Sequence, residues 1–251
     1  MLIALPNAFG DAATNMAIDA ALLESIPAGL AAFRHYAWLE PAATFGYAQR
    51  YEDVVCELAR TLRESGQPQA RASSHTTYCR RLTGGGIVDH RNDWTYALVI
   101  HSSLPCAATP ATELYQQIHL AIRLALKEMG IESRLAPCPR HCDEPPKASD
   151  APSQCFVTPA ANDVLRPDGQ KIAGAAMKRS RQGLLIQGSI DRDALPEDFD
   201  FATFQKRLLA QVASALNLPI GELEDIRPLF NSERIEREKQ RFDSKEWNQR
   251  R

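Results

Sequence analysis

Residues 80–90, RRLTGGGIVDH, place three consecutive glycines between an arginine pair and a histidine. Three glycines are costly to order, because glycine has more backbone freedom to lose than any other residue. Their bare amides can form a nest for an anion, and Arg80 or Arg81 can add charge-assisted hydrogen bonds. A strand is expected to follow at Trp94, unlike the strand-to-helix setting of dinucleotide and P-loop motifs. The alternative is a flexible hairpin whose arginines are solvated.

A second candidate site lies in the segment NDVLRPDGQKIAGAAMKR, where Lys171 begins a strand of small and apolar residues. Gly174 and Ala175 leave room for a ligand beside the backbone, and a lysine there can hold its ammonium at the mouth of a pocket. Asn162 and Asp163 can orient the lysine or can serve as turn residues that start a strand. The alternative is an edge-strand lysine that guards against aggregation.

The chain has six cysteines, and a framework of disulfides is not expected, since no export signal is apparent. The segment CPRHC, from Cys138 to Cys142, contains half of a possible zinc site. No second Cys/His pair follows at ligand spacing, so we interpret it as loop and expect no metal. The cysteines are Cys56, Cys79, Cys106, Cys138, Cys142 and Cys155.

The composition is that of a soluble globular protein. The 251 residues are 44% hydrophobic and 24% charged, with a formal net charge of −2. This balance provides no basic field for nucleic acid. No apolar run approaches the ~20 residues of a membrane helix, and the N-terminus lacks the features of a signal peptide. We expect a cytoplasmic protein that binds neither nucleic acid nor membrane.

Hydrophobic periodicity predicts an α+β protein with an antiparallel or mixed sheet and helices packed on it. A long exposed loop is expected between residues 136 and 159, which are rich in proline and polar residues. The charged tail is expected to form a surface helix anchored by Trp247. Helices are predicted over 11–26, 51–66, 111–130 and 201–216. Strands are predicted over 33–39 and 41–49, with breaks at Pro41 and Gly46, and over 94–101, 162–166, 171–179 and 183–190.

Several segments together resemble the lipoate–protein ligase and octanoyltransferase family, in the family's order and over most of the chain. They are NMAIDAALL, GYAQ, RRLTGGGIVDH, ND…GQKIAGAAMKR…GLLIQGSI and EWN. The resemblance implies one catalytic domain over residues 1–251, similar to biotin–protein ligases and class II aminoacyl-tRNA synthetases. In this fold a central, largely antiparallel or mixed sheet is flanked by helices, and an acyl chain lies in an apolar tunnel.

The resemblance also implies roles for individual residues. Lys171 matches the family lysine that contacts the acyl carbonyl or the acyl-phosphate oxygen. An ammonium in that position would stabilise the negative charge that develops on the oxygen. By the resemblance, the residues that line the acyl and nucleotide or carrier site are Arg80, Gly84, Gly85, Gly86 and His90. The residues around Lys171 that we also expect to bind substrate are Asn162, Asp163, Gly174 and Ala175.

Two reactions are compatible with the resemblance. A transferase takes octanoyl from acyl carrier protein through a cysteine thioester and needs no cofactor, and a ligase activates free lipoate with ATP and Mg²⁺. Cys155, in PSQCF, resembles the cysteine of a ligase-like octanoyltransferase branch, and Lys171 could favour its thiolate. The alternative is an inert thiol. The absence of an accessory domain after EWN favours the transferase or the catalytic half of a two-chain ligase, whereas GGG and ND are typical of ligases.

The expected acceptors are lysines of lipoyl-domain proteins, namely 2-oxoacid dehydrogenase E2 subunits and the glycine cleavage H protein. The group transferred is octanoyl or lipoyl. A third possibility is a family member that binds an acyl carrier without turnover. Intact Lys171 and Cys155 argue against it. We therefore favour the octanoyltransferase, with the lipoate–protein ligase as the alternative.

Overall fold

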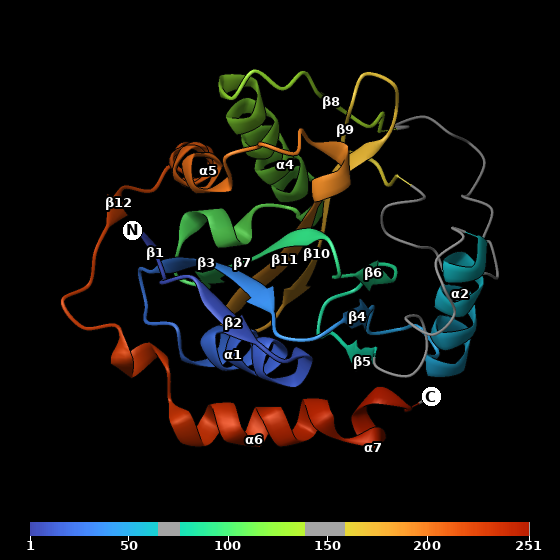
Figure 1. Cartoon of the computed structure of the whole chain (residues 1–251). Coiled ribbons are helices and arrows are strands. Elements are labelled where there is room, and N and C mark those ends of the chain that lie inside the picture. The colour runs from blue at the N-terminus through green and yellow to red at the C-terminus, as the bar shows by residue number, and fades with distance from the viewer. Residues whose placement is uncertain (65–75, 139–158, 251) are drawn as a thin grey trace.

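A computed structural model describes residues 1–64, 76–138 and 159–250 (Figure 1). Its helices are α1 (Ala12–Ser25), α2 (Tyr51–Glu64), α4 (Ala111–Glu128), α5 (Phe201–Leu216), α6 (Ser232–Asp243) and α7 (Lys245–Asn248), with 3₁₀ turns at Pro105–Ala108, Arg192–Ala194 and Arg227–Leu229. Its strands are β1 (Leu2–Ala4), β2 (Ala8–Gly10), β3 (Ala31–Trp38), β4 (Ala42–Phe45), β5 (Thr77–Arg80), β6 (Val88–Asp89), β7 (Asp93–His101), β8 (Arg134–Leu135), β9 (Val164–Leu165), β10 (Lys171–Arg179), β11 (Gly183–Asp191) and β12 (Ile220–Gly221).

The main sheet is mixed, which confirms the expected α+β class. Over the described residues it has nine strands in the order β12-β1-β3-β7-β11-β10-β9-β8, with β2 beside β3. The pairs of β1 with β12 and β3 and of β2 with β3 are parallel, and the others are antiparallel. Helices α4 and α5 cover one face, and α1 and α6 cover the other (Figure 1).

Strand β7 is buried on both faces because it lies at the centre of this sheet. Trp94 and Leu98 pack into the cluster under α4 and α5. Ala97 and Val99 pack into the opposite cluster, which includes α1. Successive side chains of a strand point to opposite faces, so the strand's two apolar faces supply both layers of the core.

Helix α1 packs on the sheet through small and apolar residues, among them Met16 and Ala20. Asp11 caps its N-terminus by accepting a hydrogen bond from the Thr14 amide. The same buried face carries Asp19, whose carboxylate lies 2.6 Å from the Arg34 guanidinium of β3. A fully buried ion pair is stable only when its remaining hydrogen bonds are satisfied, which limits how this helix can move.

A smaller sheet, β5-β4-β6, holds the Gly-rich segment between β5 and β6. The tail closes against it through Trp247, which is 6% exposed and donates from Nε1 to the Arg80 carbonyl at 2.8 Å. This confirms the expected anchor. The loop predicted over 136–159 falls largely on residues 139–158, outside the described ranges. Among the described helices, none combines the length and apolar character needed to cross a membrane.

Candidate functional site

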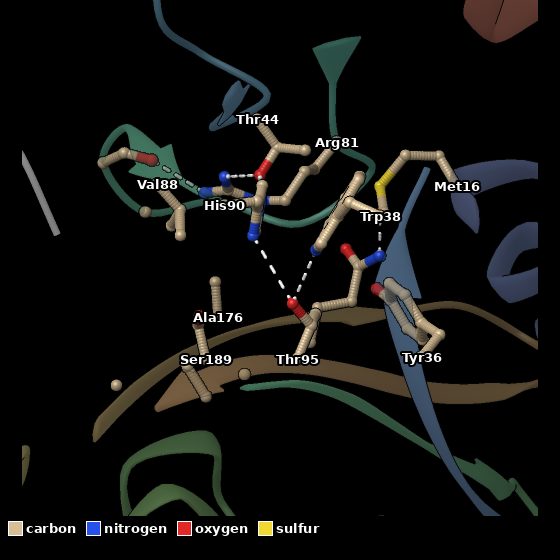
Figure 2. Close-up of a pocket in the computed structure, with 16 residues that line it drawn as sticks. Met16, Tyr36, Trp38, Thr44, Arg81, Val88, His90, Thr95, Ala176 and Ser189 are labelled. Atoms are coloured by element: carbon tan, nitrogen blue, oxygen red, sulfur yellow. Dashed lines mark hydrogen bonds between the residues drawn. The ribbon is translucent and has the colours of Figure 1, made fainter. Parts of the chain in front are cut away.

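A narrow slot runs between the Gly-rich segment and the face of the main sheet that α1 covers. It holds about 400 Å³ free of protein atoms, part of it open to solvent. In Figure 2 Met16 and Tyr36 lie at one end and Val88 and Ala176 at the other. Met16 and Tyr36 are at most 2% exposed, so theirs is the closed end. The lining residues are Met16, Tyr36, Trp38, Thr44, Arg81, Gly85, Gly86, Val88, His90, Thr95, Gly174, Ala175, Ala176, Gln187, Gly188 and Ser189.

Lys171 is buried, with its side chain 3% exposed, and it forms an ion pair with the fully buried Asp163 at 2.7 Å. Tyr115 donates its hydroxyl hydrogen to Asp163 Oδ1 at 2.5 Å, and the Ala160 amide donates to Oδ2 at 2.6 Å. Several donors hold this buried carboxylate in place. The ammonium is therefore held in one position, which argues against an edge-strand lysine in solvent.

Gly174 brings the Lys171 ammonium to the wall of the slot. A Cβ on Gly174 would lie 2.5 Å from Lys171 Nζ, so the lysine occupies the space that any larger residue would fill. Strand β9 pairs with β10 only as far as Ala173, which leaves the next part of β10 as an open edge. There the Ala175 amide donates to the Tyr115 hydroxyl at 3.2 Å.

The Gly-rich segment forms the facing wall. Gly85 has φ +86, a left-handed conformation that favours glycine, and a Cβ on it would be 3.3 Å from the Ala176 Cβ. A Cβ on Gly46 would be 2.0 Å from the Gly85 carbonyl oxygen, so these two backbones touch. The glycines and the strand that Lys171 begins therefore meet along one side of the slot.

Arg81 is the arginine that lines the slot. Its guanidinium donates to the carbonyls of Gly84 and Gly86 at 2.9 and 2.8 Å and to Thr44 Oγ1 at 2.7 Å. Arg80 instead points toward the tail. Its guanidinium donates to five backbone carbonyls, those of Tyr47, Gln49, Trp247, Asn248 and Arg250. Neighbouring residues of a strand face opposite ways, a signal that could have separated the two arginines.

His90 lies in the slot with both ring nitrogens engaged. Nδ1 is 2.7 Å from Asp93 Oδ2, Nε2 is 2.7 Å from Thr44 Oγ1, and the ring stacks on Trp38 at 3.9 Å. Thr44 accepts from the arginine described above, which leaves its own hydrogen for Nε2 and the ring proton on Nδ1 for the carboxylate. A buried carboxylate that orients an imidazole in this way fixes one tautomer.

The closed end of the slot is polar but fully bonded. Gln187 donates to Asp19 Oδ2 at 2.8 Å and accepts from Thr83 at 2.8 Å, and Tyr36 donates to the same carboxylate at 3.0 Å. This chain of bonds ties the Gly-rich segment, β11 and α1 together. Groups that are satisfied in this way do not need a ligand to complete them, so an apolar chain end can lie against them.

The structure gathers most of the predicted site residues but not all. Gly85, Gly86, His90, Gly174 and Ala175 line the slot, and Lys171 and Asp163 lie directly beside it. Gly84 and Asn162 line a shallower groove on its outer side, which the slot shares through Gly85, Ala175 and Ala176. Cys155 lies outside the described residues. Residues that the sequence analysis did not single out include Met16, Tyr36, Trp38, Thr44, Thr95, Tyr115, Gln187 and Ser189.

Within the described ranges no three His, Cys, Asp or Glu side chains are placed to hold a metal ion. Asp163, the carboxylate that pairs with Lys171 beside the slot, also accepts from Tyr115 and the Ala160 amide. These residues therefore do not fit a Mg²⁺ ion without rearrangement, and no chemical step is assigned to one.

The fold is that of the lipoate–protein ligases. A putative lipoate protein ligase from T. acidophilum with bound lipoic acid superposes with a TM-score of 0.68 at 18% identity, covering 98% of this chain and 97% of that one. Lipoate-protein ligase A bound with ATP superposes with a TM-score of 0.69 at 18% identity, covering 98% and 97%.

The sequence comparisons identify the family. The lipoyl protein ligase A/B catalytic domain model matches residues 11–227. Octanoyltransferase LipM of Kyrpidia tusciae is 32% identical over 192 residues, which are 75% of this chain and 65% of that protein. Octanoyltransferase LipM of Staphylococcus epidermidis is 31% identical over 199 residues, 78% and 67% of the two chains. This chain belongs to the lipoyl protein ligase A/B catalytic domain family.

Proposed function

We propose that this protein transfers an octanoyl or lipoyl group to a lysine of lipoyl carrier domains, as an acyltransferase of protein lipoylation. The observation that carries the proposal is the fixed Lys171 ammonium beside Gly174, at the wall of a slot that the Gly-rich segment closes from the other side. The relatives named octanoyltransferase support the same reaction. The donor we propose is octanoyl–acyl carrier protein, which places the enzyme in the cytoplasm with that carrier.

The hydrocarbon of the acyl group lies in the slot. Burial of a methylene contributes about 0.8 kcal/mol, so an eight-carbon chain supplies much of the binding free energy. The carbonyl then lies at the open end, near Gly174 and the facing glycines.

The proposed chemistry has two acyl transfers. In the first, the Cys155 thiolate attacks the thioester carbonyl of the donor, a new thioester forms on Cys155, and the carrier leaves as its thiolate. In the second, the neutral amine of the acceptor lysine attacks that carbonyl and an amide forms. The bond to Cys155 breaks, and its sulfur leaves as a thiol with the proton that the amine loses. In both steps the Lys171 ammonium stabilises the oxyanion, and a single such donor is worth 10²- to 10³-fold in rate.

Mass spectrometry of the whole protein tests this scheme. Mixed with octanoyl–acyl carrier protein, the protein is expected to gain one octanoyl group that hydroxylamine removes, and Cys155→Ser is expected to lose that adduct. A lipoyl domain of a 2-oxoacid dehydrogenase or the glycine cleavage H protein should then accept the group. If the domain is modified only with free acid, ATP and Mg²⁺, and Cys155→Ala is fully active, the protein is a ligase and the transferase proposal is wrong.

A further inference from the structure

A cluster of cationic side chains surrounds one exposed tyrosine beside the slot. Tyr47 is 44% exposed, and the guanidinium of Arg250 stacks on its ring at 3.8 Å. The ammonium of Lys178 lies 5.5 Å from the same ring. Arg241 stacks on Trp247 at 3.8 Å, and the Trp247 and Tyr47 rings are 6.0 Å apart. We call Tyr47, Lys178, Arg241 and Arg250 the cationic rim.

The positive charge of the rim is largely uncompensated. Of its cations, Arg241 has a carboxylate partner, Glu238 at 3.1 Å. Within the described part of the chain, neither Lys178 nor Arg250 forms an ion pair. Arg250 lowers the pKa of the Tyr47 phenol, and Lys178 and Arg241 lower it further, so their fields meet at this phenol. The whole chain has a net charge of −2, so the rim is a local feature of the surface.

The rim adjoins the open end of the slot. The Tyr47 amide donates to the Thr83 carbonyl at 2.9 Å, directly before the Gly-rich segment. Lys178 lies on β10 two residues beyond Ala176, and alternate residues of a strand share a face, so both point to the slot's side of the sheet. Lys178 lies four residues beyond Gly174 along the extended strand, a span of roughly 13 Å.

We infer that the cationic rim docks the donor carrier protein, by receiving the phosphodiester that joins the acyl-bearing arm to the carrier together with the acidic side chains around it. This inference rests on the proposed function. The span from Gly174 to Lys178 is within the reach of an extended phosphopantetheine arm. The acceptor is a less suitable occupant, because its reactive lysine would approach past Lys178 as a second cation, and like charges repel.

Charge reversal at Lys178 tests the inference, because this exposed side chain does not line the slot. For Lys178→Glu, the KM for octanoyl–acyl carrier protein is expected to rise about tenfold, since rim charges act on encounter and docking. Added salt should raise the wild-type KM and have a smaller effect on the variant. The KM for octanoyl-pantetheine, which lacks the phosphate, should not change. Lys206→Glu, on α5 away from the slot, is the matched control and should behave as wild type.

Three results would overturn the inference. The first is an unchanged KM for the carrier donor. The second is an equal rise for octanoyl-pantetheine, which would place Lys178 in acyl binding. The third is a rise confined to the lipoyl-domain acceptor, which would assign the rim to that partner. Fluorescence anisotropy of labelled octanoyl–acyl carrier protein measures docking without turnover. Weaker binding by Lys178→Glu than by Lys206→Glu would therefore support the inference even if the transferase reaction itself failed.

Discussion

Lys171 Nζ lies 2.5 Å from the point where a Cβ on Gly174 would be, so the glycine is what lets the ammonium reach the slot wall. Gly174→Ala is expected to displace the ammonium and to lower acyl transfer by 10²- to 10³-fold, the usual cost of one lost oxyanion donor. Because the displaced ammonium would lose contact with its buried partner Asp163, we also expect the melting temperature to fall. Activity and melting temperature, measured on the same preparation, check both effects.

Gly183→Ala is a suitable contrast, because its added methyl group would be 2.2 Å from the Ile100 carbonyl oxygen, a rigid backbone atom. This variant is expected to be destabilised. If Gly174→Ala kept full activity, or lost no more activity than Gly183→Ala, the positioning of Lys171 by Gly174 would be refuted.

Tyr115 positions the ion pair and the open edge of β10 at once. Tyr115→Phe removes the hydroxyl that donates to Asp163 and accepts from the Ala175 amide. We expect kcat to fall about tenfold with little change in KM, because the acyl slot is untouched while the carboxylate loses a donor worth about 1.5–3 kcal/mol. A rise in KM with an unchanged kcat would instead show that Tyr115 contacts substrate.

The buried imidazole of His119 is expected to make the free energy of unfolding depend on pH. Burial lowers the pKa of its imidazole from 6.5 to about 3, with a smaller effect from the Lys171 cation. The folded state keeps the ring neutral, whereas the unfolded chain binds a proton below pH 6.5. The free energy of unfolding is therefore unaffected by this ring above pH 6.5 and falls by about 1.4 kcal/mol per pH unit as the pH drops toward 3.

Between pH 7 and pH 5, His119→Leu should therefore lose less stability than the wild type, as measured by urea unfolding. Among the described residues neither ring nitrogen has a hydrogen-bond partner. Leucine removes two buried polar atoms, so the variant should also be more stable than wild type at pH 8, by about 1–3 kcal/mol. A less stable variant at pH 8 would mean that the imidazole makes a bond essential to the fold.

The two neighbouring arginines should give opposite phenotypes. Arg80→Met removes five hydrogen bonds to tail and loop carbonyls, so we expect a loss of more than about 3 kcal/mol of stability and faster proteolysis of α7. Arg81→Met releases the carbonyls of Gly84 and Gly86, so activity should fall more than stability does. Urea unfolding and single-turnover acylation, compared for the two variants, distinguish the roles.

The elements of the fold could be predicted from the sequence because their apolar periodicity is strong. The helix predicted over 111–130 is α4 (Ala111–Glu128), and the strand predicted over 94–101 is β7 (Asp93–His101). Short strands were less predictable, and β1 and β2 were not expected. The break expected at Gly46 is confirmed, because β4 ends at Phe45. Its cause is a tertiary contact that local pattern does not contain, the packing of Gly46 against the Gly85 carbonyl.

The candidate site was predictable where small residues and charge coincide, as at Lys171 and the three glycines. The closed end of the slot was not, because Met16, Tyr36 and Gln187 come from distant segments and have the appearance of ordinary core residues. Their common location arises from the pairing of β3, β7 and β11, which a single sequence does not specify.

The early end of β9 leaves one side of the slot entrance without a neighbouring strand. Because β9 stops pairing at Ala173, the backbone from Ala175 to Met177 borders a groove instead of another strand. A redesigned segment that continued the strand pairing past Ala173 would cover this edge of β10 and block the groove. We therefore expect access of an acyl group to depend on where the strand pairing ends as much as on any side chain.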